Sequence, residues 1–444
     1  MKNYFKYFFV ICIGMSVMPR PAGAESLEDI KAMMQQMKAD YEEKIKALEA
    51  KIDEIGTKQQ EQMARVDEKI EKEMLDVDYV GRNNAPVGKG GLLVKNPFGF
   101  GSVSLGGYVD FVYKDFEDTD STFDQHRWII NIGAELAERL RFNSEFEIEH
   151  GGPDAAGGGE AKVEQAFMDY LINDAINLRA GALLVPFGRY NLYHDSDLQD
   201  LTDRPIVARD VIPTTWTESG VGIFGEFDPS IASKDINLGY ELYVTNGLGT
   251  GFTDTGLSAS RGSIKLDNNE DKAMVGRLKV SPAIGHEIGL SKYWGEYNKI
   301  EDRIDGTGVD FLSTWGPLEL VGEYAYFGIE ESPTAASDLS NYFQGAYAQA
   351  NYHFWPKFFD NTFLGRGFKN PTLTFVNRYD WARIGDDSDA NSGDNEEDRY
   401  TVGLNYRPIE SFVVKFEYQW NHTKNEALEN GDNNGFVTSV AMGF

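Results

Sequence analysis

The 444-residue chain contains almost no cysteine. Its single cysteine, Cys12, lies in an N-terminal stretch with the features of a secretory signal: Lys2 and Lys6 precede an apolar core, and the small residues 22–24 form a cleavage site. We therefore expect residues 1–24 to be a signal peptide that is removed. The remaining chain would have no thiol, which excludes disulfides, cysteine metal sites and cysteine nucleophiles.

Long apolar runs and basic residues are also scarce. Beyond the N-terminus, no stretch is long and apolar enough to cross a bilayer as a helix. Acidic residues outnumber Lys and Arg by 71 to 42, which gives a formal net charge of -29 and argues against a nucleic-acid partner. The six histidines show no metal-ligand spacing, and no phosphate-binding glycine loop or nucleophile elbow is found. We predict no cofactor and no enzymatic activity.

Residues 25–80 carry a helical pattern. Apolar residues recur every three or four positions from Leu27 to Val77, and Lys, Glu and Gln fill the positions between them. This seam predicts an α-helical coiled coil, because such a helix gains stability by pairing with copies of itself. A solvated spacer helix with no fixed partner is the alternative. Residues 81–97, which begin with GRNNAPVGKGG, are predicted to be a linker.

From residue 98 onward, the pattern is that of long strands with one apolar and one polar face. Near the C-terminus, for example, Phe416, Tyr418 and Trp420 alternate with Glu417 and Gln419. A soluble sandwich also alternates, but ten-residue strands with aromatics at the ends of the apolar face are typical of membrane barrels. Sixteen strands are predicted to start near residues 103, 124, 139, 162, 175, 217, 236, 271, 285, 303, 318, 341, 371, 398, 411 and 435.

The predicted fold class is therefore all-β: a transmembrane antiparallel β-barrel of about 16 strands over residues 98–444, preceded by the coiled coil. The connections mostly alternate between short turns and long loops, as barrels require, with exceptions at 297–302 and 355–370. The longest connection, residues 185–216, contains three prolines and a dense mixture of Asp and Arg. A loop of this length in a compact fold is usually functional.

Three segments resemble the phosphate-selective porin O and P family of bacterial outer membranes. They are RAGALLVPFGRYN at 179–191, the pair Arg204-Pro205 and YVTNG at 243–247. The resemblance implies an outer-membrane location in contact with outer-membrane lipid, with the coiled coil in the periplasm. It also implies a homotrimer, and a third external loop, 185–216, that folds into the barrel and narrows the pore.

Anion selectivity in this family depends on Lys and Arg side chains that line the pore. The candidates here are Arg189, Arg204 and Arg209 in the loop and Arg127, Arg141 and Arg179 on the wall. The loop has no lysine and also carries the aspartates Asp195, Asp197, Asp200, Asp203 and Asp210. For each arginine, a salt bridge that holds the wall is the alternative role. We expect a porin for passive diffusion of small ions and polar solutes, anions such as phosphate among them, with weak ion preference and no tight phosphate site.

Other functions are open at this point. A barrel hydrolase needs only a serine and a histidine that meet across strands, and a third class is a barrel that sheathes a partner protein or tethers the envelope through its helix. Single-channel conductance separates a porin from both. In the acidic stretch 385–398, Asp387, Asp389 and Asn391 have the every-second-residue spacing of a calcium loop. A solvated acidic loop is the alternative there.

Overall fold

The computed structural model describes residues 27–73, 76–82, 85–96, 100–153, 158–231, 234–262, 264–265, 267, 270–330, 340–385, 395–424 and 432–444. The chain divides into two compact units, residues 1–74 and 75–444. The predicted signal peptide lies outside the described residues, so it stays a prediction.

The first unit contains the helix α1 (Leu27–Glu73), which has 47 residues and a length of about 70 Å. Its apolar seam is exposed: Met37, Leu48 and Ile52 have 58%, 60% and 66% of their surface accessible. Within the described residues, no helix is both long and apolar enough to span a membrane. The predicted helix is thus observed, while its pairing with other copies stays a prediction.

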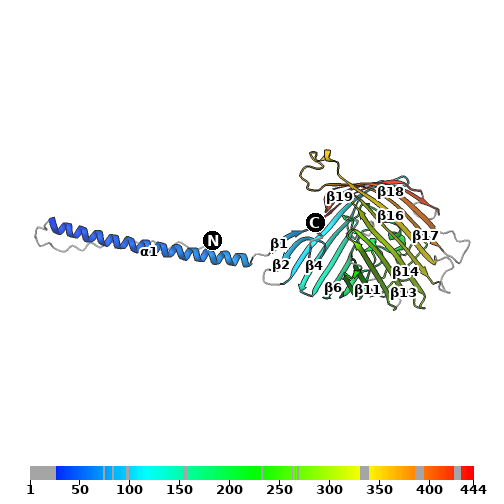
Figure 1. Ribbon diagram of the computed structural model, residues 1–444, viewed down its shortest axis with the longest axis horizontal. Helices are drawn as coiled ribbons and strands as arrows, with labels where there is room; N and C mark the ends of the chain where they lie inside the picture. Colours follow the sequence, from blue (N-terminus) through cyan, green and yellow to red (C-terminus); the bar gives the residue numbers. More distant parts are fainter. Residues whose placement is uncertain are drawn as a thin grey trace. The chain divides into compact units, whose positions relative to one another are not determined.

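The second unit is a closed antiparallel barrel of sixteen strands (Figure 1). The strands are β3 (Ser102–Phe116), β4 (Thr122–Ala137), β5 (Leu140–Glu149), β6 (Glu160–Asn173), β7 (Ile176–Leu184), β8 (Thr217–Phe227), β11 (Asn237–Thr245), β12 (Ala273–Ala283), β13 (His286–Glu296), β14 (Arg303–Trp315), β15 (Leu318–Ile329), β16 (Tyr342–Phe354), β17 (Thr372–Gly385), β18 (Asn395–Ile409), β19 (Phe412–Thr423) and β20 (Gly435–Gly443). Each strand pairs with the next, and β20 closes the ring on β3, with Gly435 opposite Phe116. Every predicted strand start lies within three residues of the observed one.

The two faces of the strands explain why this sequence closes into a barrel. On β19, Phe416 and Trp420 point outward and are exposed, while Lys415, Glu417 and Gln419 are buried inside the ring. The register of a strand is set by this alternation, because a shift by one residue would exchange the two faces. The exposed apolar faces form the surface that a bilayer covers.

The segment before β3 differs from the prediction. Helix α1 ends at Glu73, and residues predicted to be helical form the strand β1 (Asp76–Val80). Within the predicted linker, β2 (Gly91–Lys95) pairs with β1 and with residues 102–105 of β3. The physical reason is that β20 pairs with β3 only from Tyr108 onward, so the start of β3 offers unpaired backbone groups that β2 satisfies.

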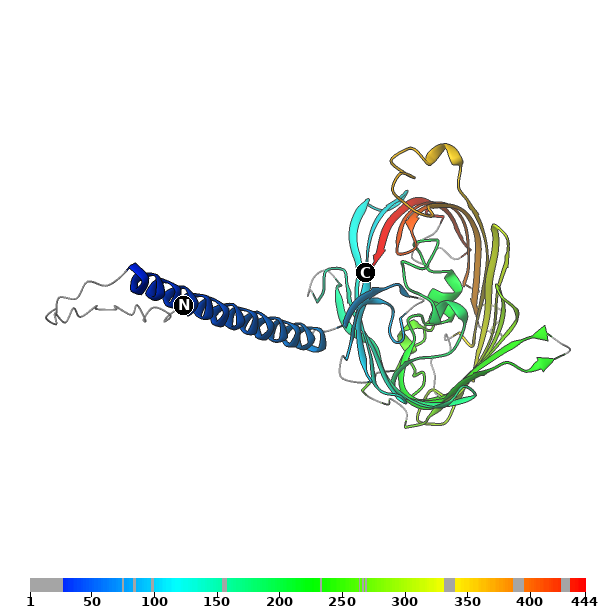
Figure 2. The same ribbon diagram turned by 60° about the vertical axis from the view of Figure 1, so that its left-hand side comes forward.

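The connections divide the barrel into two ends, here called the turn end and the loop end. Most links at the turn end are short, and both predicted exceptions to the alternation are observed. Residues 297–302 form a short link at the loop end, and the segment from β16 to β17, with the short helix η4 (Lys357–Phe359), is long at the turn end. This segment, drawn in yellow to orange, stands clear of the barrel wall in both views (Figures 1 and 2). The small hairpin of β9 (Ser230–Ile231) and β10 (Lys234–Asp235) extends the link from β8 to β11.

Candidate pore constriction

Residues 185–216, here called the inserted loop, connect β7 to β8 at the loop end and fold back inside the ring of strands (Figure 2). The loop contains two short helical turns, α2 (Arg189–Leu192) and η2 (Val207–Val211). Its backbone is bonded to the wall: Thr202 N donates to Glu417 Oε2 at 2.9 Å, and Tyr190 N donates to Glu323 Oε2 at 3.0 Å. The loop therefore lies inside the ring and is bonded to strands β15 and β19.

An apolar core holds one side of the inserted loop against the wall. Trp216 is fully buried, and its ring centroid lies 5.1 Å from that of Tyr293 on β13. Phe187 packs on Phe327 of β15 at 4.9 Å. The buried residues of the loop in this cluster are Val185, Phe187, Ile206, Val207, Val211, Ile212 and Trp216. Sequence reasoning did not predict this apolar core, which confines open space to the rest of the cross-section.

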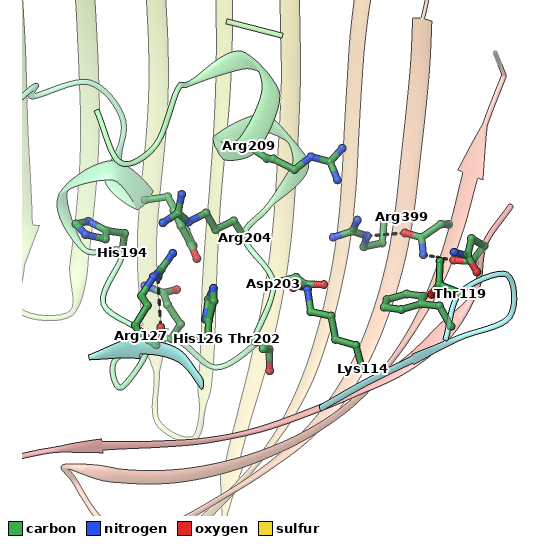
Figure 3. Close-up of a pocket in the computed structure, with 16 residues that line it drawn as sticks. Lys114, Thr119, His126, Arg127, His194, Thr202, Asp203, Arg204, Arg209 and Arg399 are labelled. Atoms are coloured by element: carbon green, nitrogen blue, oxygen red, sulfur yellow. Dashed lines mark hydrogen bonds and ion pairs between the residues drawn. The ribbon is translucent and has the colours of Figure 1, made fainter. Parts of the chain in front are cut away.

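A cavity of about 420 Å³, here called the loop-side cavity, lies between the inserted loop and the loop end of the barrel (Figure 3). Its lining contains five cationic side chains and one carboxylate. They are Lys114, Arg127, Arg204, Arg209 and Arg399, together with Asp203. His126 and His194 also contribute to the lining. The groups that face the cavity are therefore predominantly cationic, although the chain as a whole is strongly acidic.

Apart from Asp203, which pairs with Lys114, the carboxylates that pair with these cations lie outside the cavity lining. The Arg127 Nε atom is 3.2 Å from Glu147 Oε1 and 3.2 Å from Glu149 Oε1. Arg209 pairs with Asp210 at 2.7 Å and also with Glu397. Such pairs offset the cost of burying the cations.

Arg204 differs from the other loop arginines. Its Nη1 donates to the backbone oxygen of Thr214 and its Nη2 to Thr215 Oγ1, while its buried Nε has no partner among the described residues. Within the same residues, no carboxylate lies at ion-pair distance from it. Burial, and then the neighbouring Arg127 charge, lower the pKa of Arg204 below its ordinary value. A buried guanidinium without a counter-charge is the feature most suited to receiving an anion.

Each of the five aspartates in the loop has a cationic partner. Asp195 and Asp197 pair with Arg82, Asp195 also with Lys89, Asp200 with Arg407, Asp203 with Lys114 and Asp210 with Arg209. Burial alone would raise the pKa of Asp203, but the charges of Lys114 and Arg399 more than offset it, so this pKa lies well below its usual range. Asp203 is thus an ionised partner of Lys114.

A second cavity of about 270 Å³, here called the turn-side cavity, lies on the opposite side of the inserted loop. Tyr190 and Gln199 line both cavities. Its charged lining residues are Arg189, Asp200 and Glu319. Arg189 is itself paired with Glu287 on β13 at 2.8 Å. The two sides of the loop therefore present different balances of charge.

Of the three predicted wall arginines, the structure brings only Arg127 to the loop-side cavity. Arg141 pairs with Glu135 at 3.0 Å near the turn end. Arg179 pairs with Asp169 at 2.7 Å between the rings of Phe167 and Phe224, at 4.1 and 4.4 Å. For Arg141 and Arg179, the geometry corresponds to the alternative of a salt bridge in the wall.

The predicted calcium ligands Asp387, Asp389 and Asn391 lie outside the described residues, so that site stays a prediction. Within the part of the chain that is described, no three His, Cys, Asp or Glu side chains gather into a potential metal site.

Sequence reasoning missed two cations of this region, Arg82 and Lys89. Lys114 and Arg399, by contrast, lie on the polar faces of β3 and β18 near the loop end, where the strand alternation places lumen-facing side chains. Arg82 and Lys89 lie in the segment predicted to be a linker. No pattern in that segment indicates that it enters the barrel, because Asp195, the partner that both cations share, is more than a hundred residues away.

Comparison with known proteins agrees with this architecture. The family model for phosphate-selective porin O and P matches residues 106–444. An uncharacterized protein of Aquifex aeolicus is 40% identical over 152 residues, a match that covers 33% of this chain and 32% of that relative. The chain thus aligns with about a third of the length of this relative.

Three solved structures share the fold at low identity. The Vibrio cholerae outer-membrane protein OmpT has a TM-score of 0.50 at 11% identity, covering 78% of this chain and 98% of its own. The outer membrane channel DcaP of Acinetobacter baumannii has 0.50 at 12%, covering 79% and 99%. Salmonella typhi OmpF, in complex with daunomycin, has 0.52 at 13%, covering 77% and 98%.

Proposed function

Because the chain belongs to the phosphate-selective porin O and P family, we propose that it forms an outer-membrane channel through which small ions and polar solutes diffuse, with a preference for anions. The observation that carries this proposal is the loop-side cavity, where five cations and one carboxylate face the open space. Charges at a narrow, partly desolvated passage act at short range. Charges on distant external loops are screened beyond about 10 Å at physiological salt.

The pairing of the loop aspartates changes the expectation of weak ion preference. That expectation left the sum of three arginines and five aspartates open, because the aspartates could either face the pore or pair with the arginines. Asp203 is the one aspartate in the lining of the loop-side cavity, and Lys114 neutralises it at 2.8 Å. Arg204, by contrast, has no carboxylate partner among the described residues. The local balance therefore favours anions.

Reconstitution of the folded protein into planar bilayers tests the channel. We expect stepwise ohmic conductance and, in a potassium chloride gradient, a reversal potential of the sign that chloride permeation produces. Added phosphate should reduce the chloride current if phosphate occupies the loop-side cavity. Folded, heat-modifiable protein that conducts no current would contradict the channel and favour the alternative, a barrel that sheathes a partner or tethers the envelope.

The exposed seam of α1 supports a second proposal, that the protein is a trimer whose helices form a coiled coil in the periplasm. The helix has 47 residues, enough for several heptads, and a single chain leaves the apolar residues of the seam exposed. Deletion of residues 27–73 should leave the barrel able to fold and should weaken the oligomer, as measured by native mass or cross-linking in detergent. An oligomer of unchanged stability would show that the barrel wall alone holds the copies together.

A further inference from the structure

Residues 81–90, here called the entry segment, join β1 to β2, and the described part of this segment (81–82 and 85–90) lies against the inner surface of the barrel. Ser104 Oγ on β3 donates to the Val87 backbone oxygen at 2.8 Å, and Lys89 N donates to Asn131 Oδ1 on β4 at 3.0 Å. Gly88 has a φ of +75°, and a Cβ atom there would lie only 2.6 Å from Ser104 Oγ. The close approach therefore requires glycine, and it fixes the position of Lys89.

Two cations of the entry segment reach the inserted loop. Arg82 Nη1 lies 2.7 Å from Asp195 Oδ2, and Arg82 Nη2 lies 3.4 Å from Asp197 Oδ1. Lys89 Nζ lies 2.7 Å from Asp195 Oδ2 and 2.6 Å from Glu145 Oε1 on β5. Two positive charges therefore compensate only part of the charge of three carboxylates, and all three carboxylates are buried.

The loop carboxylates involved lie next to the permeation space. His194 and Ser196, the neighbours of Asp195 in the chain, both line the loop-side cavity. Arg127 Nη1 donates to Ser196 Oγ at 3.4 Å, so the cavity cation and the aspartate share one short stretch of loop. Burial would raise the pKa of Asp195, but Lys89 and then Arg82 hold it at about 2. Asp195 therefore remains ionised, and its effect on a passing ion depends on its partners.

We infer that Arg82 and Lys89 are specificity-determining residues of the pore, which mask the charges of Asp195 and Asp197 and so leave the cavity cations dominant. This inference rests on the proposed channel function. It assigns a role in permeation to a segment outside the matched family region, which begins at residue 106. The barrel strands supply the cations of the cavity, and the entry segment determines how much loop charge opposes them.

Reversal potentials of charge variants test the inference. Lys89→Met leaves Asp195 and Glu145 with one cation fewer, so the anion-to-cation permeability ratio should fall about threefold. Asp195→Asn alone should raise the ratio by a similar factor. The double variant Lys89→Met/Asp195→Asn should return the ratio toward that of the unmodified protein, which a merely structural role for Lys89 would not produce. Lys89→Arg should keep the original ratio.

Lys95→Met is the matched control, because Lys95 also pairs with an aspartate, Asp78 at 2.9 Å, but is exposed on β2. Its ratio should not change. If Lys89→Met fails to fold, two other variants test the inference: Asp195→Asn should raise the anion-to-cation permeability ratio, and Arg82→Met should lower it. Equal ratios for all folded variants would overturn the inference. If the unmodified channel has no anion preference, the proposed selectivity is wrong. The inference can still be tested in that case, because Lys89→Met and Asp195→Asn should shift the permeability ratio in opposite directions.

Discussion

The loop-side and turn-side cavities lie on opposite sides of one loop and differ in charge. The first is lined by five cations and one carboxylate, the second by Arg189 with Asp200 and Glu319. Both belong to a chain of net charge -29, so the total charge does not determine the charge that an ion meets. The charge that an ion meets depends on which side chains face the cavity and which are neutralised by ion pairs outside its lining. Selectivity should therefore depend on a few residues on the loop side.

The largest expected effect comes from removing the unpaired cation of the loop-side cavity. A unit charge about 5 Å from an ion contributes about 0.8 kcal/mol in bulk water, a factor of about four, and more where protein excludes water. Arg204→Gln should therefore lower the anion-to-cation permeability ratio at least about fourfold, as measured by reversal potential. Arg139→Gln, which alters an exposed arginine at the turn between β4 and β5, is the control. An unchanged ratio in folded Arg204→Gln protein would show that the charge of the loop-side cavity does not determine selectivity.

A change on the turn side should have the opposite sign and a smaller size. Glu319 accepts a hydrogen bond from Asn351 Nδ2 at 3.0 Å, and glutamine can keep that contact without the charge. Glu319→Gln should raise the anion-to-cation ratio by about twofold, because one opposing carboxylate is lost from the path. Current rectification should decrease at the same time, since the two sides become more alike. An unchanged ratio would show that the turn-side cavity lies off the permeation path.

The smallest expected effect is a pH dependence through His194. Its Nδ1 lies 2.8 Å from the Asn191 backbone oxygen and its Nε2 lies 3.0 Å from Glu164 Oε1, so both nitrogens face acceptors and the protonated ring suits the site. Burial lowers the pKa of His194, but the charge of Glu164, its hydrogen bond to the ring and the charge of Asp195 together raise it more, so the pKa lies above its ordinary value. The charge is therefore present below about pH 6.5 and is lost as the pH rises through the raised pKa.

Raising the pH from 6 to 9 should thus weaken anion preference slightly, by less than about twofold, because the change removes one positive charge beside the five cations of the cavity lining. Reversal potentials at the two pH values measure this effect. The His194→Gln variant should lack the component due to His194. If the variant keeps the full pH dependence of the unmodified channel, another group on the loop side titrates in this range.

The strand pattern predicted most of the fold, because alternation along β19 or β3 is a local property that a bilayer and a lumen impose on every strand. The loop arginines were also predictable, since 185–216 is conspicuous by its length. The ion pairs of the loop were not predictable. Asp195 meets Lys89 and Asp203 meets Lys114 only because the ring of strands closes, and a linear pattern carries no information about such contacts. Strand β1 was missed for a related reason, because its partner β2 is itself defined by the free edge of β3.

The bonding of the inserted loop has a consequence for the order of assembly. Its partners include Glu323 on β15, Asp380 on β17 and Glu417 on β19, all far downstream of the loop in the chain. The loop can take its final position only when these strands are in place, and such long-range contacts form slowly. The passage therefore acquires its final width in one of the last steps of folding, after the wall has become nearly complete.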